Sequence, residues 1–201
     1  MNIPTDRRAE LLEKIVDALL EGGAADLSLR PLAERVGTSA RLLIYHFDSK
    51  EQLVASALTE VRRLIGVSLT QRSARDRPQS LRDLLLMFWD WATDAANQRY
   101  FRLLFEVDGL AMFERISFSQ EARRANSAVW VDLIGGAASR LPKGAELYSA
   151  RATLIVCALN GLLQEFLQTN DLETTSSALV ALIDLVCADN AASVVLQSPN
   201  S

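Results

Sequence analysis

Apolar residues near the N-terminus recur at the spacing of one face of a helix. They follow the pattern i, i+3, i+4, i+7 and are Leu12, Ile15, Val16 and Leu19. Thr5 or Asp6 can cap the start of this helix, and the pair Gly22 and Gly23 can end it. The pattern predicts a first helix that follows a short N-terminal arm.

A second, short helix is bounded by residues that start and stop helices. Ser28 can cap it, and Pro31 is tolerated in its first turn, where a missing N–H loses little. Its apolar side chains share one face and are Leu29, Leu32, Ala33 and Val36. Gly37 can then adopt the left-handed backbone that lets the chain turn sharply.

A third helix is predicted directly after this turn. Ser39 can cap it, and Leu43 and Phe47 lie four residues apart on its inner face. The helix is expected to end near Asp48. Residues 29–47 are therefore predicted to form two short helices joined by a tight turn, a geometry in which the second helix projects from the surface.

The rest of the chain is also predicted to be helical, because alternating strand-forming residues are scarce. Ser49 and Gln52 have the spacing of a capping box, so a fourth helix should begin at Lys50 and continue through Leu64. Residues 71–79 are predicted to form an exposed connection. Further helices are expected at about residues 80–97, 99–107, 118–140, 145–168 and 175–190.

These elements predict an all-α fold with two domains. Residues 1–50 are expected to form an N-terminal three-helix, helix-turn-helix domain, and residues 51–201 a larger helical domain. A projecting helix fits the major groove of B-DNA, with its N-terminal residues nearest the base edges. We therefore expect double-stranded DNA as a partner of the first domain.

Two sets of residues are predicted to contact this DNA. The bases are expected to be contacted by the start and outer side of the third helix, at Ser39, Ala40, Arg41, Leu42 and Tyr45. Arg41 can donate two hydrogen bonds to a guanine edge, and Ala40 or Leu42 can pack against a thymine methyl group. The groups suited to phosphates are Ser28, Arg30, Thr38, His46 and Lys50.

The distribution of charge supports DNA binding only in the segment of the predicted helix-turn-helix. The net charge of the whole chain is −4, which does not favour a uniformly basic nucleic-acid-binding protein. Between Ser28 and Lys50, however, four cationic residues stand against two acidic ones. The local basic excess therefore coincides with the predicted helix-turn-helix.

The residues around the turn form a longer and more specific pattern. They are Ser-Leu-Arg-Pro-Leu-Ala-Glu-Arg-Val-Gly-Thr-Ser at 28–39 and Leu-Ile-Tyr-His-Phe-Asp-Ser-Lys-Glu-Gln-Leu at 43–53. This pattern resembles the DNA-binding signature of the TetR/AcrR family of transcriptional regulators. The resemblance implies that Thr38 and Lys50 contact phosphate and that residues 39–45 form the recognition helix.

Two positions depart from the pattern of that family. Thr38 stands where a Val is frequent, and Ile44 stands where a Tyr is common. The hydroxyl group of that Tyr, and the phosphate contact it would make, are missing from position 44. Tyr45 is the candidate replacement.

Aromatic residues gather in the middle third of the chain. Each aromatic residue taken singly is explained by packing in the core. Taken together, these residues can also line an apolar cavity that binds a small molecule. We expect a small apolar or aromatic effector to bind to Phe88, Trp89, Phe101, Phe105 and Trp130. Arg102, Asn160 and Gln164 are the candidate polar anchors.

Two later segments carry long apolar faces. One consists of Leu154, Ile155, Ala158, Leu162 and Phe166, and the other of Leu179, Leu182, Ile183 and Val186. Such a pair can close the core of its own domain, or it can form a four-helix bundle with a second copy, as the family resemblance implies. Because two recognition helices on a palindromic operator require two-fold symmetry, we expect a homodimer.

The resemblance also implies a mechanism. It predicts a repressor whose C-terminal domain binds the effector and thereby changes the separation of the two DNA-binding heads. Activation of transcription and a ligand-free architectural role remain alternatives. So do a helical small-molecule carrier or enzyme with an incidental helix-turn-helix, and a protein–protein adaptor.

Other chemistry has less support in the sequence. His46 is the only histidine, and its neighbours favour a structural or phosphate-facing role over catalysis. Cys157 and Cys187 lack the spacing of a zinc site and are predicted to be buried, reduced thiols. No nucleophile–base set and no glycine-rich phosphate loop is found, so we expect no enzymatic activity, metal or cofactor.

The cellular compartment is predicted from two further observations. Residues 1–10 do not resemble a signal peptide. The apolar run from Thr153 to Leu163 is shorter than the about 20 residues that span a bilayer. We therefore expect a cytoplasmic protein that does not enter a membrane.

Overall fold

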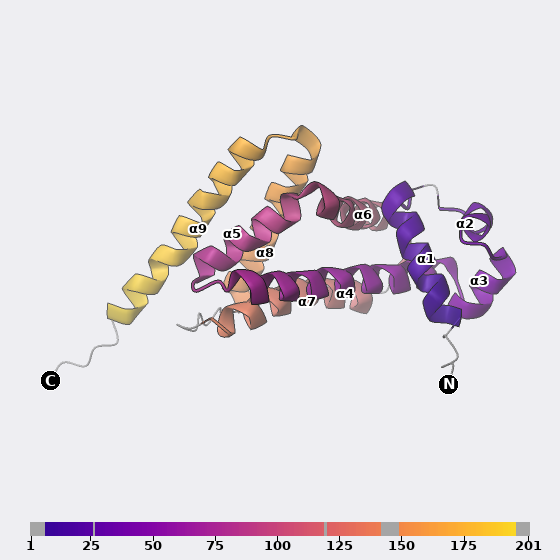
Figure 1. Ribbon diagram of the computed structural model, residues 1–201, viewed down its shortest axis with the longest axis horizontal. Helices are drawn as coiled ribbons and strands as arrows, with labels where there is room; N and C mark the ends of the chain where they lie inside the picture. The colour runs from indigo at the N-terminus through magenta and orange to yellow at the C-terminus, as the bar shows by residue number, and fades with distance from the viewer. Residues whose placement is uncertain (1–6, 26, 119, 142–148, 196–201) are drawn as a thin grey trace. The chain divides into compact units, whose positions relative to one another are not determined.

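The computed structural model describes residues 7–25, 27–118, 120–141 and 149–195 (Figure 1). Every regular element within these ranges is an α-helix, so the all-α prediction is confirmed. The helices are α1 (Arg7–Gly22), α2 (Leu29–Arg35), α3 (Ala40–Phe47), α4 (Lys50–Asp76), α5 (Leu81–Thr93), α6 (Ala95–Met112), α7 (Gln120–Ser139), α8 (Ser149–Thr169) and α9 (Leu172–Val195).

The chain forms two compact units. The first consists of Met1–Ser68 and Ala95–Arg123, and the second of Leu69–Asp94 and Arg124–Ser201. The first unit therefore holds α1, α2, α3, most of α4 and α6, and the second holds α5, α8, α9 and most of α7. The functional division after residue 50 stays a prediction.

The core of the first unit forms where α1, α2, α3 and the start of α4 meet (Figure 1). Its fully buried large side chains include Leu11, Ile15, Leu19, Leu43, Phe47 and Leu53. Leu12, which the sequence predicted to face inward, is half-exposed, and Leu11 is buried instead. The buried residues of α1 are spaced i, i+4, i+5, i+7, i+8, so Ile15, Val16 and Leu19 face inward as predicted and Leu11 takes the place of Leu12.

Serine side chains cap the described starts of α3, α4 and α5. The hydroxyl of Ser39 accepts a hydrogen bond from the Leu42 N–H at 3.2 Å, as predicted. The hydroxyl of Ser49 accepts from the Gln52 N–H at 3.1 Å, which is one half of the predicted capping box. Ser28 occupies the N-cap position of α2 with extended backbone, but its side chain makes no capping hydrogen bond, so that part of the prediction is wrong. The other proposed caps, Thr5 and Asp6, lie outside the described residues.

A full capping box begins α5. The Ser80 hydroxyl accepts from the Asp83 N–H at 3.1 Å, and the Asp83 carboxylate accepts from the Ser80 N–H at 3.0 Å. The Ser80 hydroxyl and the nearby backbone N–H groups of Gln79 and Ser80 hold the pKa of Asp83 below its usual value. This cap fixes the start of the helix one residue after the predicted position.

Two glycines adopt the left-handed backbone that the turns require. Gly37 has φ +72°, and it ends α2 as predicted. Gly23 has φ +74° and follows α1. A Cβ atom at position 23 would lie 2.7 Å from a carboxylate oxygen of Glu106 on α6, so the backbone conformation favours glycine and any side chain there would displace the Glu106 carboxylate.

Glu106 fastens α6 to the turn that follows α1. Its carboxylate oxygens accept hydrogen bonds from the N–H groups of Ala24 at 2.7 Å and Ala25 at 3.0 Å. These N–H groups have left the helix and need acceptors from elsewhere. A side chain remote in sequence thus completes the end of α1.

Helix α4 continues beyond its predicted end. The sequence predicted an exposed connection over residues 71–79, but α4 runs to Asp76. Arg72 and Arg75 both pair with Asp76, and the segment contains neither Gly nor Pro before Pro78. Favourable helix formers and ion pairs therefore outweigh the polar composition that suggested a loop. Likewise, α6 runs to Met112 rather than ending near residue 107.

In the second unit, α8 and α9 form an antiparallel pair, and α5 packs against both (Figure 1). Most of the two predicted apolar faces lie in this interface, including the buried residues Ile155, Phe166, Leu179, Ile183 and Val186. Trp89 of α5 contacts the Phe166 ring, with 6.4 Å between the ring centroids. Its indole N–H donates to the Ser176 hydroxyl at 2.9 Å. The interior of this unit is therefore built largely from the faces that the sequence proposed.

The two cysteines, Cys157 of α8 and Cys187 of α9, were predicted to be buried. Cys157 is exposed and Cys187 is half-buried, and both are free thiols. Because α8 is apolar around most of its circumference, its sequence does not reveal which face is buried. The prediction that both thiols are buried is wrong.

One described helix resembles a membrane span by length and composition alone. This segment, Ala150–Thr169 of α8, is longer than the apolar run identified in the sequence, and a third of it is buried. Its buried residues pack against α5 and α9, as in the core helix of a helical domain.

The Glu106 contacts generate a stability prediction. Glu106→Ala should lower the free energy of unfolding by about 1–2 kcal/mol, because two backbone N–H groups lose a charged acceptor. Glu106→Gln keeps one oxygen acceptor and should lose less. Urea unfolding followed by circular dichroism measures both. An alanine variant as stable as the parent would contradict this account of the turn.

The two N-cap serines offer a matched pair for a second prediction. Ser39→Ala should destabilise the protein by about 1 kcal/mol, because the Leu42 N–H loses its acceptor. Ser28→Ala removes no capping hydrogen bond and should change stability by less than about 0.5 kcal/mol. Thermal unfolding of both variants side by side provides the comparison, and equal losses would argue against it.

Candidate nucleic-acid interface

Helix α3 has one buried side and one exposed side. Leu43 and Phe47 are fully buried and hold the helix against the rest of the first unit. On the other side, Tyr45 is 77% exposed and Leu42 is 47% exposed, and Arg41 is also exposed. The projecting helix that the sequence predicted is therefore present.

The residues predicted to contact bases fall into two groups. Tyr45 lies three residues after Leu42 and four after Arg41, so the three side chains share the outer face of α3. Ala40 is half-buried, and Ser39 is exposed but uses its hydroxyl to cap the helix. The structure thus brings three of the five side chains together on one solvent-facing surface.

The residues predicted to contact phosphates lie around this face within the same unit. Ser28 is exposed at the start of α2, and Lys50 is half-buried as the first residue of α4. Thr38 is half-buried in the turn, where its N–H donates to the Ala33 carbonyl at 2.9 Å. Arg30 is exposed and lies 3.6 Å from the Glu34 carboxylate. His46 is half-buried, with its ring edge-on to that of Tyr45 at 5.2 Å.

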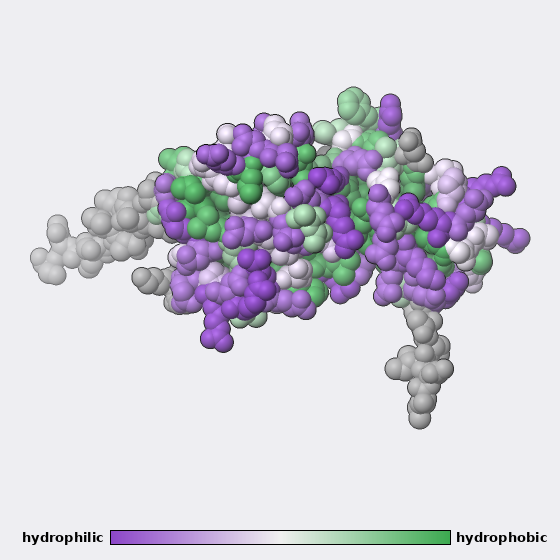
Figure 2. Space-filling view, turned by 45° about the horizontal axis from the view of Figure 1, so that its top comes forward, coloured by the Kyte–Doolittle hydropathy of each residue, from purple (hydrophilic) through white to green (hydrophobic). Residues whose placement is uncertain are grey.

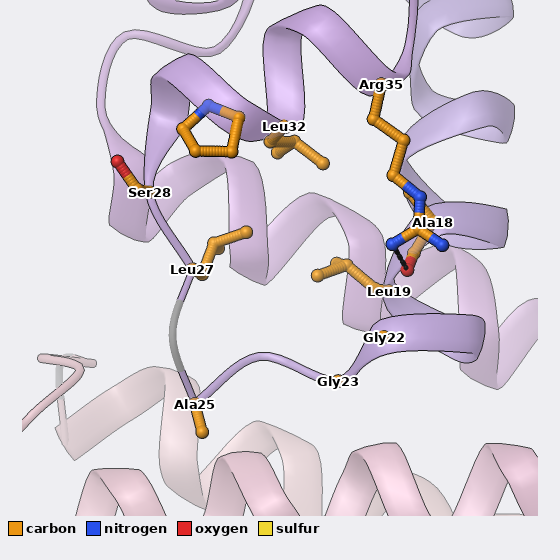
Figure 3. Close-up of a pocket in the computed structure, with 10 residues that line it drawn as sticks. Ala18, Leu19, Gly22, Gly23, Ala25, Leu27, Ser28, Leu32 and Arg35 are labelled. Carbon is orange, nitrogen blue, oxygen red and sulfur yellow. Dashed lines mark hydrogen bonds between the residues drawn. The ribbon is translucent and has the colours of Figure 1, made fainter.

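Arg35 contributes less to the local positive surface than its charge suggests. Its guanidinium donates to the Ala18 carbonyl at 3.2 Å and to the Glu21 carboxylate at 2.8 Å. Figure 3 shows the arginine reaching back from α2 to α1, beside a small cavity of about 190 Å³. Arg30 likewise lies near an acidic residue, Glu34. The other two cations of residues 28–50 are Arg41 and Lys50, and in the described part of the chain neither has an acidic partner.

One residue that contacts α3 was missed by the sequence analysis. Arg8 of α1 donates from Nε to the carbonyl oxygen of His46 at 3.1 Å, and its guanidinium lies 5.0 Å from the centre of the Phe47 ring. Its Nη2 atom also lies 3.4 Å from the Ser56 hydroxyl on α4. No local pattern marks this residue, because its partners are 38 and 48 positions away in the sequence.

The aromatic residues proposed for an effector site are divided between the two units. In the first, Phe101 is buried and Phe105 half-buried, with 6.4 Å between their ring centroids. Arg102 is exposed and donates to the side chain of Gln98 at 3.0 Å. All three belong to α6.

The remaining effector candidates belong to the second unit. Trp89 is buried with its N–H satisfied, which fits the core-packing alternative. Phe88 is half-buried next to Trp91 on α5. Trp130 and Asn160 are also half-buried, and Gln164 is exposed. The lining of the effector site stays a prediction.

The N-terminal segment matches the model of a known protein family. Residues 11–57 match the family model of bacterial regulatory proteins of the tetR family. The match begins within α1 and ends within α4, so it includes all of α2, the turn and α3. A comparison with curated protein sequences found no match.

Solved structures show that the fold extends over most of the chain. A Rhodococcus sp. protein assigned to the TetR family of transcriptional regulators is 24% identical, with a TM-score of 0.66 over 90% of this chain and 97% of its own. A Streptomyces coelicolor A3(2) protein assigned as a transcriptional regulator is 20% identical, with a TM-score of 0.67 over the same shares. The multidrug binding protein EbrR, complexed with imidazole, is 20% identical, with a TM-score of 0.65 over 90% of each chain.

The segment that carries the candidate interface matches the family model, and the whole arrangement of helices matches structures assigned to the same family. The family assignment therefore covers residues 11–57, and over 90% of its length the chain shares the fold of solved structures assigned to that family.

Proposed function

We propose that this protein is a homodimeric repressor that binds a palindromic operator through α3 and leaves it when a small apolar or aromatic effector binds. The observation that carries the proposal is the two-sided character of α3. Leu43 and Phe47 anchor the helix from behind, and Arg41, Leu42 and Tyr45 stand on its open side. A helix held in this way can enter the major groove without rearranging the core.

Base contacts are assigned to the outer face of α3. The guanidinium of Arg41 is able to donate two hydrogen bonds to the O6 and N7 atoms of a guanine. The exposed side chain of Leu42 offers an apolar contact for a thymine methyl group. Tyr45 lies on the same face, so its hydroxyl is available to a base or to a phosphate.

Phosphate contacts are assigned to the surrounding polar groups. Lys50 is the first residue of α4, where its positive charge is unfavourable next to the positive end of the helix dipole. A bound phosphate would relieve that repulsion, which makes Lys50 the strongest candidate. Ser28 keeps its hydroxyl out of the α2 cap, so that group can donate to a phosphate oxygen. Arg30, Thr38 and His46 complete the proposed set.

Dimerisation is assigned to the side of α8 and α9 that the core does not use. On α8, Leu154 is 56% exposed and shares a face with exposed Cys157 and Gly161. On α9, Leu185 is 71% exposed and lies one turn after exposed Ala181. In Figure 2, hydrophobic residues lie among hydrophilic ones at the surface, including the region next to the C-terminal end. Two antiparallel helices with apolar outer faces fit a four-helix bundle with a second copy.

The effector is proposed to act through a difference in affinity. A ligand shifts the protein away from DNA only if it binds more tightly to the conformation that fits DNA poorly. The fold is shared with EbrR, a multidrug binding protein, and the half-buried aromatic residues Phe88 and Trp130 of the second unit suit an apolar or aromatic ligand. Binding to chromosomal DNA places the protein in the cytoplasm.

Selection of bound sequences from random duplex DNA tests this function most directly. The proposal predicts enrichment of an inverted repeat whose half-sites are one helical turn or a small multiple of it apart. Binding without any sequence enrichment at low salt would contradict the proposal. That result would favour the alternative of a helical carrier or enzyme with an incidental helix-turn-helix.

Two substitutions should separate base contacts from phosphate contacts. Arg41→Ala should cost about 1–3 kcal/mol on the preferred sequence and relax the preference at one base pair of each half-site. Lys50→Ala should weaken binding to all sequences and reduce the dependence of log K on log[salt] by about one unit per subunit. Fluorescence anisotropy at several salt concentrations measures both effects.

A third arginine serves as the control for this pair. Arg63 is exposed on α4, where it pairs with Glu60. Arg63→Ala removes the same charge as the other two variants and should leave affinity, sequence preference and salt dependence close to those of the parent. If Arg41→Ala and Lys50→Ala behave like this control, the assignment of the DNA contacts is wrong.

The dimer also yields a prediction. Leu154→Asp should weaken self-association by roughly 1000-fold, because each lost leucine contributes about 2 kcal/mol and symmetry places the change in the interface twice. Val67→Asp, at an exposed position of α4, is the matched control and should remain dimeric. Sedimentation velocity over a range of concentrations distinguishes them. A Leu154→Asp variant that sediments like the parent would exclude this face as the interface.

A further inference from the structure

Arg8 connects three helices of the first unit through one side chain. It lies in the first turn of α1, outside the segment 11–57 that matches the family model. Its guanidinium contacts the last turn of α3 at two points, the His46 carbonyl and the Phe47 ring, and it reaches Ser56 on α4. A planar, charged group with several donors is suited to such a junction.

The His46 carbonyl is a group that α3 cannot satisfy by itself. The last four carbonyls of a helix have no partner within the helix. At the end of α3, the Ile44 carbonyl accepts from the Asp48 N–H at 2.8 Å and the Phe47 carbonyl accepts from the Ser49 N–H at 2.7 Å. The His46 carbonyl accepts from Arg8 at 3.1 Å. A cation at this end of the helix also interacts favourably with the helix dipole.

The contact with Phe47 acts on the anchor of α3. Phe47 is fully buried, and it is one of the two side chains that hold this helix of eight residues in place. The Arg8 guanidinium lies 5.0 Å from the centre of its ring, within the range of a cation–π interaction. Arg8 therefore contacts both the backbone and the anchoring ring at the end of α3.

We propose that Arg8 is a positioning residue for α3: it fixes the C-terminal end of the helix against α1 and α4 and so sets the direction in which Arg41, Leu42 and Tyr45 point, without touching DNA itself. The inference rests on the proposed function of α3. It differs from that proposal in assigning a role to a residue on another helix.

The test compares Arg8→Ala and Arg8→Lys with a matched control. Lys14→Ala removes the same charge from the same helix, and the partner of Lys14 is Glu10 within α1. Two quantities are measured for each variant at a temperature well below unfolding. One is hydrogen exchange of the backbone N–H groups of residues 42–48 in the free protein. The other is the dissociation constant for the selected operator as a function of salt.

Arg8→Ala should accelerate exchange in residues 42–48 by about tenfold and leave exchange in α8 unchanged, because the lost contacts are local to the end of α3. It should raise the dissociation constant by about tenfold at every salt concentration, with the salt slope of the parent. Arg8→Lys keeps the positive charge but lacks the planar guanidinium with its several N–H donors. Its exchange rate and dissociation constant should therefore lie between those of Arg8→Ala and the parent. Lys14→Ala should match the parent in both.

Several results would overturn the inference, and they differ from a failure of the proposed function. A salt slope reduced by about one unit per subunit in Arg8→Ala, with full recovery in Arg8→Lys, would make Arg8 a direct phosphate contact. Faster exchange in residues 42–48 with unchanged operator binding would make Arg8 a stabilising residue without a role in DNA recognition. Exchange and affinity equal to those of the parent would show no positioning at all. A parent protein that selects no DNA sequence would instead refute the proposed function.

Discussion

The burial of Leu43 and Phe47 is the interaction on which the candidate interface depends. Helix α3 has eight residues, and a helix of this length is not stable in water by itself. Its two inner side chains are fully buried, and each contributes roughly 1.5–3 kcal/mol through removal of apolar surface from water. Because these two residues lie one turn apart, all of the anchoring is on one side. The opposite side is left free for Arg41, Leu42 and Tyr45.

Helix α1 supports this arrangement because it contacts α2, α3, α4 and α6 in the first unit. It packs against α2 and α6, its Ala18 carbonyl accepts from Arg35 at the end of α2, and Arg8 reaches the end of α3. The turn after α1 is held by Glu106 of α6. Any movement of α6 relative to α1 must therefore break these hydrogen bonds or move the turn. The first unit thus contains a direct connection between α6 and the helices that carry the interface.

The parts of this structure that local signals determine were predictable from the sequence. Gly37, Ser39 and the spacing of Leu43 and Phe47 each act within one turn of the chain, and together they predicted α2, the turn and α3. Contacts between distant residues had no such signal, which is why Arg8 and Glu106 were not foreseen. The length of α4 was underestimated because polar composition suggested a loop where Arg72 and Asp76 stabilise a helix. The exposure of Cys157 was missed because α8 is apolar around most of its circumference and its periodicity does not select one face.

The central claim is that the outer face of α3 is the surface that DNA covers, and hydroxyl-radical footprinting of the protein tests it most directly. Tyr45 is 77% exposed on that face, and Phe113, after the end of α6, is 81% exposed and serves as an internal reference. Addition of a saturating amount of the selected duplex should slow the oxidation of Tyr45 and leave that of Phe113 unchanged. Equal rates of Tyr45 oxidation in the free protein and in the saturated complex would contradict the account.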